Sequence, residues 1–536
     1  MKLRFWSRRT GQAMRDEVHE ISDSKISVHD KHRFEIKLDI DLPAQQTSSY
    51  RLETYFFIPR ALNISPSTYT KGMFYSSIQR YIRFKTPRFS LARITDPSVE
   101  MSPFVRIRKN IPAILSGTKD KEITETVFNE TKLLGAVTKG AIRDFAKHLL
   151  REIALVRRSG ASGARFTMLE EMGATFVRDI ETYISAIHGL KEEALNPAVP
   201  LKLREAFLFF DEFISITIQD YLSVLLQALR SSGDLDAGLN ALDQAFAKVI
   251  LGQQSYRKSM GYPSVLSGAK TDSTLLYRRS VLKKFISNVL FLNMEFSEWE
   301  GLSQIPLAIA AGFAMLFAAS VALFAQTRYT TNSIPFIVVI VISYIFKDRL
   351  KDWLKLYLTK GLVRWTADRK IRIRDPYSSQ VIGNLKEAFS FVEQGRIPAE
   401  VLYRRNMDNI TSIDEEGKPE RVIKYEKEVE LFPARISRFH ERRRDLNDIM
   451  RLNIDDFLKQ ADDPTVAYLH LNSESGQLES SQCRRVYHVN LILKYSFYDA
   501  QKHVRFRFQR IRLILNRNGI VKLEEVMPLP GQQRRT

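Results

Sequence analysis

The chain has 536 residues, a formal net charge of +20 and a sequence pI of about 9.7. Its length exceeds what one hydrophobic core usually supports, so two or three folded units are expected, and its 44% hydrophobic content excludes a largely disordered chain. A mean hydropathy of -0.22 excludes a polytopic transporter, while the single cysteine, Cys483, excludes internal disulfides and a cysteine-based zinc site.

Residues 1–118 are predicted to form a β-rich N-terminal region. Apolar and charged residues alternate over 32–42, which is typical of a half-buried strand, and residues 51–58 form a second strand that ends at Pro59. The short polar link between them predicts an antiparallel pair, and residues 75–83 are predicted to be a short helix. The first 20 residues lack the apolar segment of a signal peptide.

Residues 119–300 are predicted to form a cytoplasmic helical bundle. Helical periodicity is interrupted at short breaks rich in serine, glycine and proline. The helix at 201–231 is apolar on most sides yet contains Asp211, Glu212 and Asp220, so we expect it to be the central core helix. The bundle is expected to lead directly into the apolar segment after it. The first predicted helix ends near residue 159, and the others cover 166–194, 201–231, 235–258 and 274–300.

Residues 303–346 are predicted to be a transmembrane hairpin of two helices, 303–325 and 329–346. Residues 305–325 contain no charged side chain, and a helix of that length rises about 31 Å, close to the roughly 30 Å hydrocarbon core of a bilayer. A second apolar stretch covers 333–346, and it is short enough that a re-entrant segment is an alternative. The other interpretation is that the two apolar stretches are a buried helix and a buried strand in the core of a soluble protein.

The first apolar helix carries a stripe of small residues that predicts close helix packing. Ala310, Ala314, Ala318 and Ala322 recur at four-residue spacing, which makes a flat face that another backbone can approach. The second stretch is bulky and β-branched, so the alanine face suits either the hairpin itself or an oligomer interface. We therefore expect a homo-oligomer or a protein partner.

Residues 347–374 are predicted to be a basic amphipathic juxtamembrane helix. Ten Lys/Arg and three Asp give this segment a charge of +7, whereas the loop between the apolar stretches holds only Arg328. The positive-inside rule then predicts a cell inner membrane protein with both termini in the cytoplasm. Lys351, Lys355 and Arg364 are candidates for contact with anionic lipid headgroups, and an ordinary bundle helix is the alternative.

Residues 375–527 are predicted to be a cytoplasmic α+β domain, followed by a flexible tail at 528–536. Helices are expected at 379–395 and 439–460. Alternating segments predict C-terminal strands, and an Asn-Gly pair at Asn518 and Gly519 predicts a tight turn between the last two. The predicted strands are 465–471, 485–497, 504–515 and 520–526.

Arginines of the last hairpin are predicted to share one basic face. Arg505, Arg507, Arg510 and Arg512 are expected on the face opposite Phe506 and Phe508. Arginine forks suit phosphate, so this face is a candidate contact for anionic lipid or an acidic protein. Nucleic acid is not favoured, because the aromatic residues are expected to point inward. A solvated face with no partner is the remaining interpretation.

Motifs for phosphate loops, dinucleotide binding and hydrolases are absent from the sequence. His29 and His32 could chelate a metal, and His470, His488 and His503 could converge with Cys483, but ordinary surface positions explain them as well. We therefore expect no catalytic, cofactor or metal site. The hypothesis is an α+β membrane-anchored scaffold or sensor that couples a cytoplasmic partner to the lipid bilayer. The alternative is a membrane-tethered effector or enzyme that acts on nucleic acid or another anionic substrate.

Overall fold

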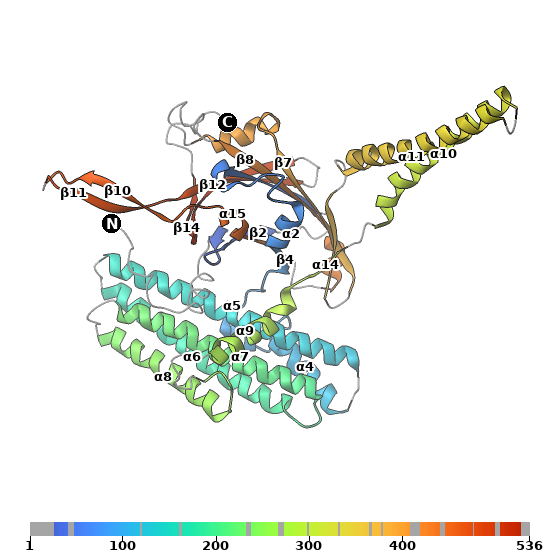
Figure 1. Cartoon of the computed structure of the whole chain (residues 1–536). Helices are drawn as coiled ribbons and strands as arrows, with labels where there is room; N and C mark the ends of the chain where they lie inside the picture. The colour runs from blue at the N-terminus through green and yellow to red at the C-terminus, as the bar shows by residue number, and fades with distance from the viewer. Residues whose placement is uncertain are drawn as a thin grey trace.

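The structure is a computed structural model with a mixed α+β fold. Helices and two extended sheets form a body, and two narrow projections leave it in different directions (Figure 1). The predicted α+β class is therefore confirmed. The residues that it describes are 26–40, 48–117, 120–159, 163–231, 237–265, 273–296, 300–330, 333–363, 367–376, 379–407, 419–439, 445–474, 476–498 and 504–526.

The larger sheet joins the two ends of the chain. β3, from the N-terminal region, lies between β12 and β8. Each pair of neighbouring strands in this sheet is antiparallel. The strands on either side of the boundaries predicted at 118 and 375 thus belong to the same sheet. In spatial order the strands are β14 (Gly519–Glu525), β13 (Val504–Asn516), β12 (Tyr487–Tyr498), β3 (Ser48–Pro59), β8 (Glu420–Leu431), β7 (Val381–Val392), β6 (Arg369–Arg374) and β5 (Asn293–Phe296).

A smaller sheet packs against the larger one. Phe34 and Ile36 are buried on its inner face, as the alternation in the sequence predicts. The predicted pairing of strand 32–42 with strand 51–58 is wrong, because β2 pairs with β1 and β9 while β3 belongs to the other sheet. Alternation indicates which face a strand buries, but it does not identify the neighbouring strand. The order is β1 (Ile26–Val28), β2 (Arg33–Ile40), β9 (Leu446–Asn453) and β4 (Ile78–Phe84).

Four segments predicted to be helical contain strands, and in one of them, 274–300, the helix ends early and β5 follows it. The segment 75–83 is the end of α2 (Lys71–Ser77) followed by β4, the segment 379–395 contains β7, and the segment 439–460 contains β9 and α15 (Asp455–Leu458). Buried charged residues explain the last two errors, because Glu387 in β7 and Asp448 in β9 interrupt the apolar alternation that marks a strand.

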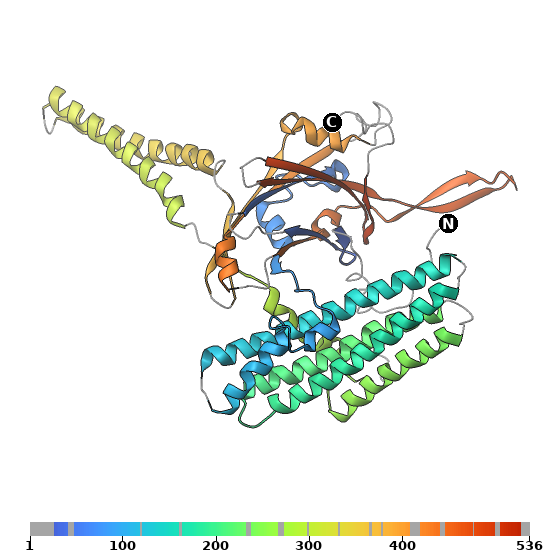
Figure 2. The same cartoon turned by 180° about the vertical axis from the view of Figure 1, so that it is seen from behind.

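The predicted bundle is present and lies beside the two sheets (Figures 1 and 2). α7 is its central helix, as predicted, and its buried carboxylates are paired: Lys191 Nζ lies 2.7 Å from Asp211 Oδ2, and Arg278 Nη2 lies 2.6 Å from Glu212 Oε2. The bundle consists of α4 (Pro103–Leu115), α5 (Lys121–Ser159), α6 (Gly163–Ala194), α7 (Leu201–Arg230), α8 (Ala237–Ser259) and α9 (Ser273–Ser287).

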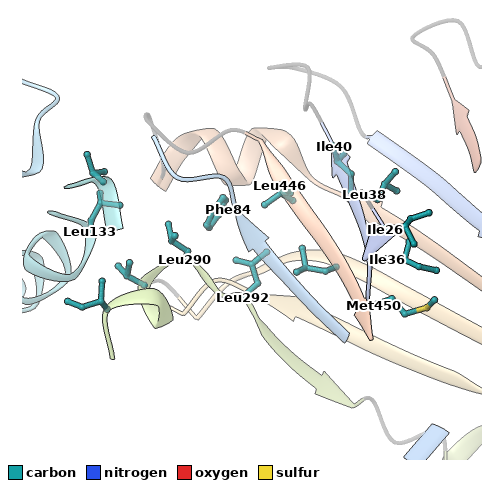
Figure 3. Close-up of a cluster of buried hydrophobic side chains, with 14 of the residues drawn as sticks. Ile26, Ile36, Leu38, Ile40, Phe84, Leu133, Leu290, Leu292, Leu446 and Met450 are labelled. Atoms are coloured by element: carbon teal, nitrogen blue, oxygen red, sulfur yellow. The ribbon is translucent and has the colours of Figure 1, made fainter. Parts of the chain in front are cut away.

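An apolar seam joins the smaller sheet to the bundle (Figure 3). Phe84 and Leu446 from the sheet and Leu133 from α5 are fully buried in one continuous cluster with Leu290 and Leu292. Sheet and bundle therefore share a core. The remaining short elements are η1 (Arg60–Leu62), α3 (Leu91–Thr95), η2 (Asn288–Leu290), η3 (Gln394–Arg396), α12 (Ala399–Arg405) and α14 (Pro433–Phe439).

Two projections leave the body (Figures 1 and 2). One is the arm, formed by α10 (Glu300–Arg328) and α11 (Ile334–Val363). The other is a β-ribbon of β10 (Thr465–Leu471) and β11 (Leu478–Arg484), which form a two-stranded sheet among the described strands and expose Leu469 and Cys483.

Charged side chains link the two sheets inside the sandwich. Lys427 Nζ on β8 lies 2.5 Å from Asp448 Oδ1 on β9, and both side chains are almost completely buried. The hydroxyl of Tyr50 on β3 donates to the other oxygen of Asp448 at 2.7 Å. On the neighbouring strands, Glu387 accepts a hydrogen bond from Tyr425 and pairs with Arg80 of β4. These contacts fix how the sheets stack, because each buried charge needs its partner on the opposite sheet.

We predict that Asp448→Ala will destabilise the protein strongly. Removal of the carboxylate leaves the Lys427 ammonium buried without its counter-ion, which should lower the free energy of unfolding by about 3–5 kcal/mol. Urea denaturation of the detergent-solubilised chain measures this change. Glu393→Gln is the control, because the Arg396–Glu393 pair is exposed and should contribute less than about 1 kcal/mol. Equal effects of the two substitutions would contradict the prediction.

Candidate membrane-contact site

The arm is an antiparallel helical hairpin that stands clear of the body (Figures 1 and 2). α10 and α11 pack along each other, and their outward faces meet no other part of the described chain. Large apolar residues cover these outward faces, although such residues normally lie in a core. Between residues 307 and 346, fifteen exposed side chains are aliphatic, methionine or phenylalanine: Leu307, Ile309, Phe313, Met315, Leu316, Phe317, Leu323, Phe324, Ile334, Ile337, Val338, Val341, Ile342, Ile345 and Phe346.

Of the helices described, α10 alone is long and apolar enough to cross a membrane. The segment that meets both conditions is Leu307–Arg328, which has a mean hydropathy of 2.3 and is only 11% buried. The low burial argues against the alternative of a core helix, because a core helix is covered by protein. Of the predicted second span, 329–346, residues 334–346 lie in α11, which becomes charged from Lys347 onward. Within the described residues, the two helices form a hairpin with one span of full length, so the predicted pair of membrane spans is not confirmed.

The alanine stripe lies at the contact between the two arm helices. Ala310 and Ala314 are buried, and Ala318 and Ala322 are half-buried. Since α10 packs on α11, small side chains on this face allow the two backbones to approach closely. The stripe is therefore covered by α11 within one chain. The exposed apolar surface is the opposite side of the hairpin.

The basic segment after the second apolar stretch is not a separate helix. No proline or glycine interrupts the chain near Lys347, so α11 continues to Val363, and residues 369–374 form β6. Lys351 and Lys355 are exposed on this part of α11, and Trp353 and Tyr357 lie exposed beside them. Arg364 lies outside the described residues, as does the tail at 528–536.

The arm is attached to the edge of the larger sheet. β5 precedes α10 and β6 follows α11, and these two strands pair in antiparallel register, with Asn293 opposite Arg374 and Phe296 opposite Ile371. Arg374 Nε lies 2.5 Å from Glu295 Oε2 across the pair. The expectation that the bundle leads directly into the apolar segment is therefore wrong. The chain leaves the bundle, adds a strand to the sheet and then enters the arm.

Three of the four arginines predicted to form one basic face have described side chains, and these three are divided between two faces of the sheet. Arg507 is exposed opposite Tyr495, whereas Arg510 and Arg512 lie opposite Ile492 and Asn490 on the other face. Strand residues an odd number of positions apart point to opposite faces, which the prediction overlooked. The side chain of Arg505 lies outside the described residues.

The second of these arginine faces carries compensating polar groups. Arg510 is 3% exposed, and its Nη2 donates to Asn490 Oδ1 at 3.2 Å. Arg512 Nη1 lies 3.9 Å from Glu524 Oε2 on β14. Phe506, predicted to point inward, is 56% exposed. The last hairpin therefore presents no continuous basic surface among the residues described.

The histidines named from the sequence do not gather into a metal site in the described part of the chain, where no cluster of three or more metal-ligating side chains occurs. His32 Nδ1 lies 2.6 Å from Asp455 Oδ1, and His470 faces Glu479 in the ribbon. His488 lies in β12, and His503 is outside the described residues.

We predict that Ala314→Leu will loosen the arm. The larger side chain must fit into the contact with α11, and overpacking of this kind costs about 1–3 kcal/mol. Amide hydrogen exchange in α10 and α11 should become faster in this variant. Ala319→Leu is the matched control, because Ala319 is exposed on the same helix and should leave exchange unchanged. If amide exchange were unchanged in Ala314→Leu and the size of the oligomer changed instead, the prediction would be contradicted, and this face would lie between two copies of the chain.

Comparison of the whole chain with known proteins finds no relative: no protein family, no curated protein and no solved structure matches it. Its function is therefore inferred from the geometry of its own residues, above all from the exposed apolar surface of the arm.

Proposed function

We propose that the protein is a membrane-anchored scaffold or sensor, with the arm inserted in a bilayer and the body in the cytoplasm. The observation that carries this proposal is the apolar outer surface of the arm. Fifteen large apolar side chains would leave water on insertion, and each contributes about 1.5–3 kcal/mol when it is fully buried. An exposed apolar surface of this extent is typical of a membrane or protein contact.

The sheet attachment supports a topology with both halves of the body on one side of the membrane. Paired antiparallel strands lie within about 5 Å of each other, so the start of α10 and the end of α11 lead from neighbouring points. A chain that crosses through α10 must therefore return through α11. We propose that both helices cross, with Arg328 and the turn on the far side.

The basic end of α11 supports the sidedness of this arrangement. Lys351 and Lys355, with Trp353 and Tyr357, form a band between the apolar part of α11 and the body. Aromatic rings and lysines of this kind favour the headgroup region, and the positive charge favours the cytoplasmic leaflet of an inner membrane. The band would rest on anionic lipid.

The same attachment supports a sensing role. β5 is the edge strand of the larger sheet, and β6 lies between it and β7. A change in packing within this sheet would therefore reach the base of the arm through covalent and hydrogen-bonded contacts. A partner or ligand that favours one packing would then bias the arm. Scaffold and sensor share this geometry and differ in whether a second packing is populated.

We predict that Leu316→Arg will weaken membrane association. Leu316 is 64% exposed near the middle of α10, and a central arginine costs about 2.5–3.5 kcal/mol in a membrane helix, which corresponds to roughly a 70- to 400-fold lower partition. Liposome flotation of the full chain measures the bound fraction. Leu469→Arg is the matched control, because Leu469 on the ribbon is also 64% exposed and should not affect flotation. A loss of flotation in both variants alike would contradict the role of the arm.

The turn of the arm should lie across the membrane from the body. In a Cys483→Ser background, Thr330→Cys places the only thiol at the turn and Lys459→Cys places it on the body, and both positions are exposed. A membrane-impermeant maleimide should label the two variants from opposite sides of sealed vesicles. Labelling of both from the same side would show that the arm enters and leaves one leaflet without crossing.

A further inference from the structure

A polar cleft of about 540 Å³ lies between the smaller sheet and α5, on the side of the sheet away from the sandwich interior. Its volume is within the range of about 300–1,000 Å³ that small-molecule sites occupy. One wall is formed by β2, β4 and β9, and the other by residues 140–144 of α5. The cleft is separate from the arm, and the proposed membrane contact makes no use of it.

Strand register brings the key side chains of the cleft together. Asn447 on the central strand β9 lies directly opposite Asp39 on β2 and opposite Arg83 on β4. Lys37 is two residues from Asp39 and therefore shares its face of the sheet. Arg143 of α5 approaches from the facing wall. Residues from four separate segments thus line one small volume.

The cleft holds more cations than carboxylates. Five Lys/Arg side chains line it against three aspartates, and one of these, Asp144, accepts two hydrogen bonds from Arg143 at 2.8 and 2.9 Å. Within the described ranges, the ammonium group of Lys37 has no hydrogen bond or ion pair. Burial and the neighbouring Arg83 guanidinium lower the pKa of Lys37. An anion in the cleft would relieve this repulsion.

A second polar group in the cleft also lacks a partner. Asn447 is 4% exposed, and its Oδ1 is buried with no hydrogen-bond donor in the part of the chain that is described. Buried carbonyl oxygens are normally satisfied, because an unsatisfied one costs about 1–3 kcal/mol. A ligand that supplied a hydroxyl or amine donor next to its anionic group would satisfy Asn447 and Lys37 together.

We propose that this cleft binds a small phosphate ester that carries hydroxyl groups, the chemistry shared by sugar phosphates and nucleotides. The phosphate oxygens would accept from Lys37 and from the guanidinium groups of Arg83 and Arg143, which suit phosphate geometry. A sugar hydroxyl beside the phosphate would donate to Asn447 Oδ1. The ligand would contact both the sheet and α5, and so would hold the two parts of the body together.

Isothermal titration calorimetry on the full chain in detergent tests this proposal. Ribose 5-phosphate and AMP separate the two sources of the ligand, and inorganic phosphate and ribose test the two halves of the chemistry. We expect at least one ester to bind, phosphate to bind more weakly and ribose not to bind. If inorganic phosphate bound as tightly as both esters, the cleft would be a simple anion site, and the proposed role of Asn447 would be overturned. Absence of binding by all the phosphorylated probes would overturn the proposal.

Three variants make the test specific to the cleft. Lys37→Met removes the ammonium group, and Asn447→Asp places a carboxylate of nearly the same shape against the anion, so each should weaken ester binding roughly 10- to 100-fold. Lys109→Met, at an exposed position on α4, should bind as the parent chain does. Equal weakening in all three would contradict the site. Tighter binding of a single-stranded oligonucleotide than of any small probe would indicate a nucleic-acid surface instead.

Discussion

Pairing between β5 and β6 is the constraint on which the placement of the whole molecule depends. These strands form the edge of the larger sheet, and the arm is inserted between them. Because antiparallel neighbours lie side by side, the arm leaves the body and returns to it at one place. The bundle precedes the arm in sequence, and most strands of the larger sheet follow the arm. Bundle and sheet nevertheless lie together at the same end of the arm. The pairing therefore turns two apolar stretches into one hairpin.

Two kinds of contact hold the body together, and they differ in what they contribute. The seam of Phe84, Leu446 and Leu290 joins sheet to bundle through apolar burial, which is favourable but not directional (Figure 3). Inside the sandwich, Lys427 and Asp448 add little net stability as a pair, but each is costly without the other. The apolar seam thus supplies cohesion, and the buried charges specify how the two sheets align. The polar cleft lies close to both, at the outer face of the same sheet.

Much of the local structure could be predicted from the sequence, because it depends on contacts between near neighbours. The strand at 32–42 and the bundle helices follow from periodicity, and the arm helices follow from the length of their apolar runs. Long-range pairing could not be predicted, since alternation does not identify a partner strand, and the buried charges of β7 and β9 obscured their strand pattern. The cleft was missed for the same reason: Lys37, Arg83, Asn447 and Arg143 converge only after four distant segments pack together. The arginines of β13 were a different error, because their sequence parity already separates Arg507 from Arg510.

Under the proposed insertion, the unequal apolar lengths of the arm helices have a consequence for the lipids that suit this chain. The segment of α10 that is long and apolar enough to span a membrane has 22 residues, whereas α11 is apolar only over 334–346, a rise of about 20 Å. Mismatch between a short segment and a thick hydrocarbon core is relieved by local thinning of the bilayer, at a cost of fractions of a kcal/mol per Å. Bilayers built from shorter acyl chains would accommodate α11 with less deformation. Acyl-chain length would thus govern where in a mixed membrane the protein collects.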